Sequence, residues 1–121
     1  MIRIDSETKV KIIARAADDK KAENILILDL RKHSAFADYF LICSAASQRA
    51  VQAVCDNIVE VLQKKGERVW HVEGYEYGQW VVVDAIDTVV HIFSHEMRSY
   101  YDLEHLWQDA VFVNINEFLP H

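Results

Sequence analysis

The chain has 121 residues, a formal net charge of −6, and a composition in which 51% of the residues are hydrophobic. This length suits one domain with a single hydrophobic core, and a content of only three glycines and one proline excludes long flexible or low-complexity segments. The acidic balance argues against broad DNA or RNA binding, which depends on Lys and Arg neutralising phosphates, and favours a basic protein partner.

The first predicted elements are a helix and a strand. Ser6 can cap the helix, and residues at three- and four-residue spacing give it one buried face: Val10, Ile13, Ala14 and Ala17. The charged residues 18–21 end this helix in solvent. A nearly continuous apolar run at residues 25–30 then predicts a strand that is covered on both faces.

A second strand and the longest helix follow. Residues 39–43 predict the strand, and Ser47 is well placed to cap the helix. The apolar face of this helix consists of Val51, Val54, Ile58, Val61 and Leu62. The helix is expected to end at residues 64–66, where two lysines face the negative end of the dipole and Gly66 can adopt a left-handed conformation.

Beyond Gly66 the hydrophobic pattern alternates, which is typical of strands. Residues 68–73, 80–83 and 89–93 predict three strands that pair as an antiparallel meander. Because a helix links the second strand to residue 68, those two strands should run parallel. A last helix is expected from His95 to about Gln108.

These elements predict a single α/β domain with a mixed sheet of about five strands and helices mainly on one face. We expect residues 1–110 to form this domain and residues 111–121 a C-terminal tail, which either adds an extended edge segment or stays loose. The order of elements resembles the nucleotidyltransferase-like topology. Enzymes of that fold use a Gly-Ser phosphate grip and an Asp-x-Asp metal pair, whereas residues 44–47 here read Ser-Ala-Ala-Ser and no such acidic pair follows on a strand.

Other enzyme motifs are absent from the sequence. His95-Glu96 begins like the zinc-protease pattern HExxH, but Ser99 occupies the second histidine position. No GxSxG, P-loop or GxGxxG motif occurs. Cys43 and Cys55 have neither CxxC spacing nor disulfide-scaffold density, so we expect two buried thiols. The N-terminus lacks a signal-peptide pattern and no apolar stretch is long enough for a membrane span, which predicts a cytoplasmic protein.

A partner-binding surface is predicted on the last two strands. Alternation places Trp80 and Asp84 on a common face of one strand, and His91 lies on the next. An aromatic patch with charged members has the composition of a protein-interface hot spot, with Trp80 as the anchor. The alternative is that Trp80 is a core aromatic. Asp38 and Tyr39 are further contact candidates, and their alternative roles are a strand-entry cap and a packed ring.

Seven strings along the chain resemble, in this order, the pattern of the Iojap/ribosomal silencing factor family. They are DKKA at 19–22, LDLR at 28–31, ADYF at 37–40, EG at 73–74, GQWVVVD at 78–84, VVHIF at 89–93 and RSYYDLEHLWQDA at 98–110. No single string is decisive, but the ordered combination is specific and runs over most of the chain.

The resemblance implies a homodimer that binds ribosomal protein L fourteen of the large ribosomal subunit. It implies that the protein blocks subunit association and represses translation under nutrient limitation, with no catalysis and no cofactor. From the net charge of −6 we expect no direct sequence-specific nucleic-acid contact. A large-subunit assembly adaptor and a nucleotidyltransferase-like enzyme are the alternatives. One departure from the family pattern is Ile86, which stands where a turn glycine is usual. Because a β-branched residue resists positive φ, we expect a different turn geometry there.

Overall fold

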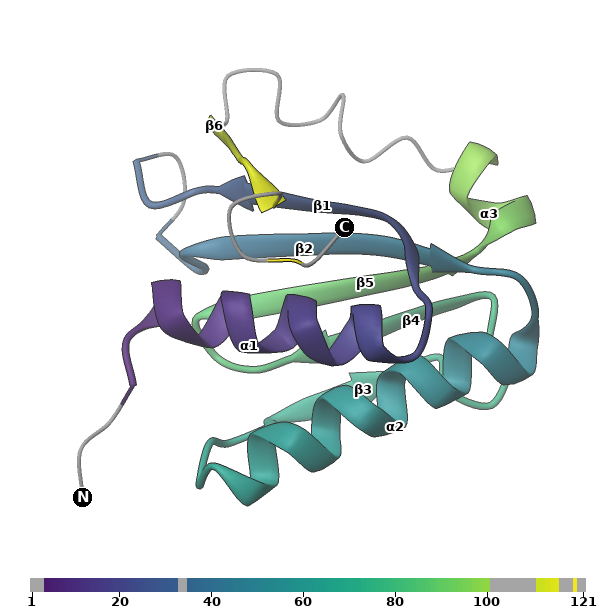
Figure 1. Cartoon of the computed structure of the whole chain (residues 1–121), viewed down its shortest axis with the longest axis horizontal. Coiled ribbons are helices and arrows are strands. Elements are labelled where there is room, and N and C mark those ends of the chain that lie inside the picture. The colour runs from purple at the N-terminus through teal and green to yellow at the C-terminus, as the bar shows by residue number, and fades with distance from the viewer. Residues whose placement is uncertain (1–3, 33–34, 101–110, 116–118, 120–121) are drawn as a thin grey trace.

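The computed structural model describes residues 4–32, 35–100, 111–115 and 119. Its elements are α1 (Ser6–Asp19), β1 (Glu23–Asp29), β2 (Tyr39–Ala45), α2 (Gln48–Lys64), β3 (His71–Glu73), β4 (Trp80–Asp84), β5 (Thr88–Ser94), α3 (His95–Tyr100) and β6 (Val111–Val113). The strands form one sheet in the order β3-β4-β5-β2-β1-β6 (Figure 1). The predicted α/β fold with a mixed sheet is confirmed, and the sixth strand comes from the segment expected to be a tail.

The sheet is mixed because of a single parallel pair among the described strands. β2 and β5 run parallel, and every other neighbouring pair is antiparallel. The predicted meander β3-β4-β5 is therefore confirmed. The helix α2 leads the chain from β2 to the far edge strand β3, and the meander brings β5 back beside β2. This path sets β4 and β5 next to each other in the outer half of the sheet.

The main core lies between the sheet and the two long helices. Figure 1 shows α1 and α2 side by side along one side of the sheet. The buried α2 residues are Val51, Val54, Cys55, Ile58 and Leu62. Burying one such side chain contributes about 1.5 to 3 kcal/mol, so this face accounts for much of the stability of the helix.

The predicted cap of α2 is confirmed, and the predicted cap of α1 is corrected by one residue. Ala50 N donates to Ser47 Oγ at 3.1 Å, so Ser47 caps α2 as predicted, and Gly66 follows the helix with a φ of 74°. The cap of α1 is Asp5 and not Ser6, because Thr8 N donates to Asp5 Oδ1 at 2.7 Å. Both residues can accept this bond, and the helix starts one position after the better-placed acceptor.

The opposite side of the sheet carries a smaller core. Ile27 and Leu28 of β1 are both fully buried although they point to opposite faces, as the apolar run predicted. Leu28 packs in a cluster with Leu30, Ile42 and Phe93. Along β4 the odd-numbered valines are buried, whereas Trp80, Val82 and Asp84 are half-exposed on this second side. The sheet therefore leaves part of β4 available to a partner.

The last predicted helix is only partly described. It begins at His95 as expected, and α3 reaches Tyr100. The remainder of the predicted helix, residues 101–108, lies outside the described residues. Met97 of α3 packs against the smaller core, which places this helix at the end of the second side of the sheet.

Candidate partner-binding surface

Three of the five predicted contact residues lie on one face of the sheet. Trp80 pairs in register with Phe93, Val82 with His91 and Asp84 with Val89, so these side chains share the side that α1 and α2 leave uncovered. We call this surface the β4–β5 face. It consists of Trp80, Val82, Asp84, Val89 and His91.

Trp80 is held in place by aromatic neighbours. Its ring stacks on Phe93, with ring centroids 5.2 Å apart and planes inclined by 24°. Its indole Nε1 donates a hydrogen bond to His91 Nδ1 at 3.1 Å. Both contacts fix the orientation of a half-buried ring whose remaining surface is exposed. A large aromatic side chain held in this way loses little conformational entropy when a partner covers it.

His91 is a buried imidazole with a defined tautomer. Its Nδ1 accepts the Trp80 hydrogen bond, so in the neutral ring the proton resides on Nε2. Burial lowers the pKa of His91 to about 4, and the ring is therefore neutral at physiological pH. Nε2 is buried and has no hydrogen-bond partner among the described residues. The packing around the ring must offset the cost of this unpaired N–H.

The turn between β4 and β5 differs from the expectation for Ile86. Its backbone adopts a φ of 77°, the left-handed conformation that a family glycine would adopt, so the prediction of a different geometry is wrong. Ile86 N donates to Asp84 Oδ1 at 2.9 Å, which closes the turn locally. A β-branched residue in this conformation is strained by about 1 to 3 kcal/mol, and the surrounding contacts must offset that strain.

A buried lysine from α1 supplies such contacts. Lys9 is 2% exposed, and its Nζ donates to Ala85 O at 3.1 Å and to Asp87 Oδ1 at 2.9 Å. Glu67 Oε1 lies 3.4 Å from Nζ, close enough for an ion pair although not aligned for a hydrogen bond. The turn beside the β4–β5 face is therefore tied to a helix on the other side of the sheet. In the sequence, the only sign of this contact is that Lys9 stands one position before the buried Val10.

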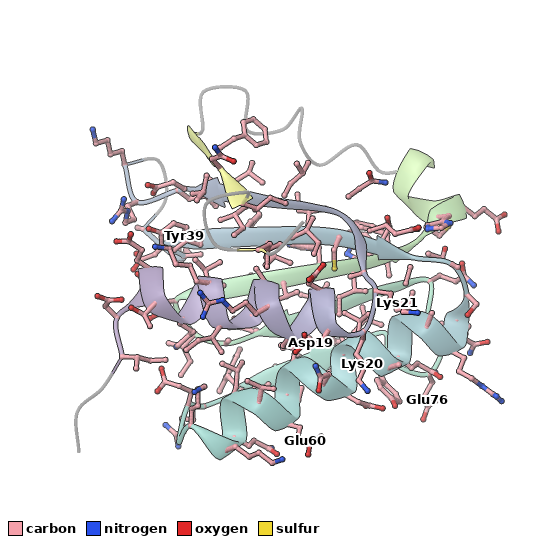
Figure 2. The ribbon with its side chains drawn as sticks, in the orientation of Figure 1. Asp19, Lys20, Lys21, Tyr39, Glu60 and Glu76 are labelled. Carbon is pink, nitrogen blue, oxygen red and sulfur yellow. The ribbon has the colours of Figure 1, made fainter. Side chains whose placement is uncertain are left out.

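Tyr39 lies on the opposite side of the sheet from the β4–β5 face, and Asp38 is bonded to the turn beside that face. Tyr39 is 2% exposed and belongs to the main core beneath the helices, and Figure 2 shows it near the N-terminal half of α1. Burial raises the pKa of its phenol, and the Arg31 guanidinium lies 5.3 Å from its ring centroid. Asp38 makes backbone hydrogen bonds, from its N to Asp87 O at 2.7 Å and from Leu30 N to its O at 2.8 Å. Tyr39 is thus the packed ring that was the alternative to a contact residue.

One exposed aromatic beside this face was not predicted as a contact. Trp70 is 72% exposed, and its backbone N donates to Asp84 O at 2.8 Å. Trp70 was expected inside a strand over residues 68–73, whereas β3 begins only at His71. Strand alternation could not reveal its exposure, because the residue precedes the regular part of the strand.

The remaining features of the described residues concern metal ligands, thiols and membrane-spanning helices. Within the described ranges, no three His, Cys, Asp or Glu side chains come together as metal ligands could. Cys43 and Cys55 are free, buried thiols, as predicted, and burial raises the pKa of Cys55 to about 11. None of the described helices is long and apolar enough to cross a membrane.

Comparison with known proteins identifies the family. The family model for "Ribosomal silencing factor during starvation" matches residues 3–120. The chain is 43% identical over 113 residues to ribosomal silencing factor RsfS of Bacillus subtilis, covering 93% of this chain and 96% of the relative.

Solved structures agree with the sequence match. A Bacillus halodurans crystal structure superposes with a TM-score of 0.81 at 38% identity, covering 90% of this chain and 99% of the other. A Chromobacterium violaceum structure gives a TM-score of 0.84 at 32% identity, with coverages of 87% and 88%. Sequence, fold and the ordered strings therefore agree, and the chain belongs to the ribosomal silencing factor family.

Proposed function

We propose that this protein docks on ribosomal protein L fourteen of the large ribosomal subunit through the β4–β5 face. Bound there in the cytoplasm, it excludes the small subunit from its joining surface and lowers translation when nutrients are limited. The observation that carries the proposal is the half-exposed Trp80, fixed by His91 and Phe93 on the side of the sheet that the long helices do not cover. The mechanism is steric and requires no catalytic residue, metal or cofactor.

The chemistry of the face suits a basic protein partner. The chain has a net charge of −6, and Asp84 adds a carboxylate on the same face as the aromatic anchor. An acidic surface accelerates encounter with a basic partner, whereas the indole, once buried by the partner, supplies most of the affinity.

Sedimentation of the tagged protein with ribosomal fractions tests this proposal. The unaltered protein should travel with free large subunits and not with assembled ribosomes. Trp80→Ala should weaken binding to purified large subunits by roughly thirtyfold, the effect of losing about 2 kcal/mol at an interface hot spot. Asp84→Asn should have a smaller effect, mainly on the association rate and its salt dependence.

Two controls make the sedimentation result interpretable. Tyr77→Ala removes an aromatic side chain that is 81% exposed and lies outside the β4–β5 face, so it should bind as the parent does. Circular dichroism must show that Trp80→Ala is folded. Equal occupancy of large subunits and translating ribosomes by the parent would refute the proposal, and a folded Trp80→Ala with parental affinity would move the contact to another surface.

We also propose that the protein is a homodimer in solution. Large hydrophobic side chains remain exposed in the described part of the single chain, among them Phe36 at 91% and Phe112 at 49%. Exposed hydrophobic surface of this kind is commonly covered in symmetric assemblies. Light scattering at micromolar concentration should give twice the monomer mass, and a monomer mass would contradict the proposal.

A further inference from the structure

A hollow next to the β4–β5 face combines three side chains from separate parts of the chain. It has a volume of about 340 Å³ and is lined by Trp70, Asp84 and Ile86. Trp70 precedes β3, Asp84 ends β4, and Ile86 lies in the turn to β5. Asp84 is also a member of the β4–β5 face, so the hollow continues the proposed docking surface at its turn end.

The indole of Trp70 is placed there by its backbone and has no role in the core. The hydrogen bond from Trp70 N to Asp84 O, 2.8 Å long, brings the residue alongside the end of β4. With 72% of its surface exposed, the indole contributes little to the buried core. The π-face of an exposed indole attracts cations more strongly than any other side-chain ring does.

The carboxylate of Asp84 is oriented before any ligand arrives. Its Oδ1 accepts the hydrogen bond from Ile86 N at 2.9 Å, which leaves Oδ2 available. Within the described part of the chain, no lysine, arginine or histidine forms an ion pair with Asp84. A fixed carboxylate without a cation is half of a charge-assisted contact.

Ile86 supplies an apolar wall that is rigidly supported. Its side chain is 39% exposed at a φ of 77°, and the flanking residues Ala85 and Asp87 are both held by the buried Lys9. The left-handed turn therefore presents a branched apolar side chain at a constant position. Such a wall suits the methylene stem of a long basic side chain.

We propose that Trp70, Asp84 and Ile86 form a subsite for an arginine side chain of the docking partner. The guanidinium stacks on the indole and donates to Asp84 Oδ2, and the methylene groups pack against Ile86. Arginine fits better than lysine because its planar group can both stack and donate in the same orientation. The assignment rests on the proposed function in one respect, namely that the arginine belongs to the partner bound at the β4–β5 face.

A titration of the free protein with N-acetyl-arginine amide, followed by two-dimensional NMR, tests the subsite itself. Saturable shifts of the Trp70 indole N–H and the Ile86 amide are expected in the millimolar range. N-acetyl-citrulline amide, which has nearly the same shape without the charge, should cause no saturable shift. Asp84→Asn and Trp70→Ala should each weaken the arginine effect about threefold or more, whereas Tyr77→Ala should not. Equal shifts with citrulline, or none with arginine, would overturn the subsite.

Binding to purified large subunits then tests where the arginine comes from. Trp70→Ala and Asp84→Asn should both reduce affinity, and Asp84→Asn should flatten its salt dependence. If arginine amide binds but neither variant changes subunit binding, the assignment to the docking partner is overturned. Because the NMR titration contains no ribosomal component, its failure refutes the subsite alone, whereas failure of the parent protein to co-sediment refutes the proposed function.

Discussion

Acidification should weaken the fold through His91. The imidazole is 8% exposed, and burial lowers its pKa from an ordinary 6.5 to about 4. Below pH 6.5 the unfolded chain binds a proton at this residue and the folded chain does not, so the free energy of unfolding falls by about 1.4 kcal/mol per pH unit. This stability is fully present above pH 6.5 and is lost by about pH 4, a total of about 3 kcal/mol.

Urea unfolding followed by circular dichroism, repeated across this pH range, measures the effect. His91→Gln keeps an oxygen that can accept the Trp80 hydrogen bond, but glutamine cannot titrate. The free energy of unfolding of this variant should therefore fall less steeply with decreasing pH, by the amount that His91 contributes. His71→Gln, on the exposed edge strand, is the matched control and should retain the contribution of His91 to the pH dependence. The Asp29 carboxyl, whose pKa Arg31 lowers below 3.8, loses its stabilising contribution only at more acidic pH. An unchanged slope in His91→Gln would refute this argument.

Two further substitutions probe the supports of the β4–β5 face by the same unfolding measurement. Lys9→Met leaves the carboxylates of Asp87 and Glu67 without their cation and should lower the free energy of unfolding by about 3 kcal/mol. Lys11→Met, on the surface, is the control and should change it by less than about 0.5 kcal/mol. Equal effects of the two substitutions would contradict the argument that the Lys9 ion pairs are buried. Gly74→Ala combines a φ of 79° with a Cβ only 2.3 Å from Trp80 O, so it should cost more than about 1 kcal/mol and shift the Trp80 indole resonance. Parental values for both quantities would show that the close approach of Gly74 to β4 does not constrain Trp80.

Features that depend on local sequence were predictable. The periodicity of α2, the cap at Ser47 and the left-handed Gly66 all involve residues within a few positions of one another, and all are confirmed. The α1 cap was wrong by one residue because Asp5 and Ser6 are adjacent acceptors. Only the geometry of the first turn distinguishes them.

Features that depend on register between distant strands were not predictable. Alternation within β4 correctly grouped Trp80 with Asp84, since both lie on one strand. Tyr39 is on β2, and its side of the sheet relative to Trp80 follows from the parallel pairing of β2 with β5. A shift of one residue in that register would have moved Tyr39 to the other side.

The conformation of Ile86 shows the same limit for a turn. Its own β-branched side chain favours a negative φ, and that preference gave the wrong expectation. The residues on either side of Ile86 are held in part by Lys9, which precedes Ala85 by 76 positions. Hydrogen bonds within the turn and from so remote a residue together offset a local preference of about 1 to 2 kcal/mol.

The Lys9 contacts also determine how deletion experiments on this protein should be interpreted. Removing α1 would withdraw the support of residues 85–87 and deform a surface on the far side of the sheet. Loss of partner binding after such a deletion would therefore not show that α1 touches the partner. Point substitutions at exposed positions of the helix, such as Arg15, can answer that question without disturbing the turn.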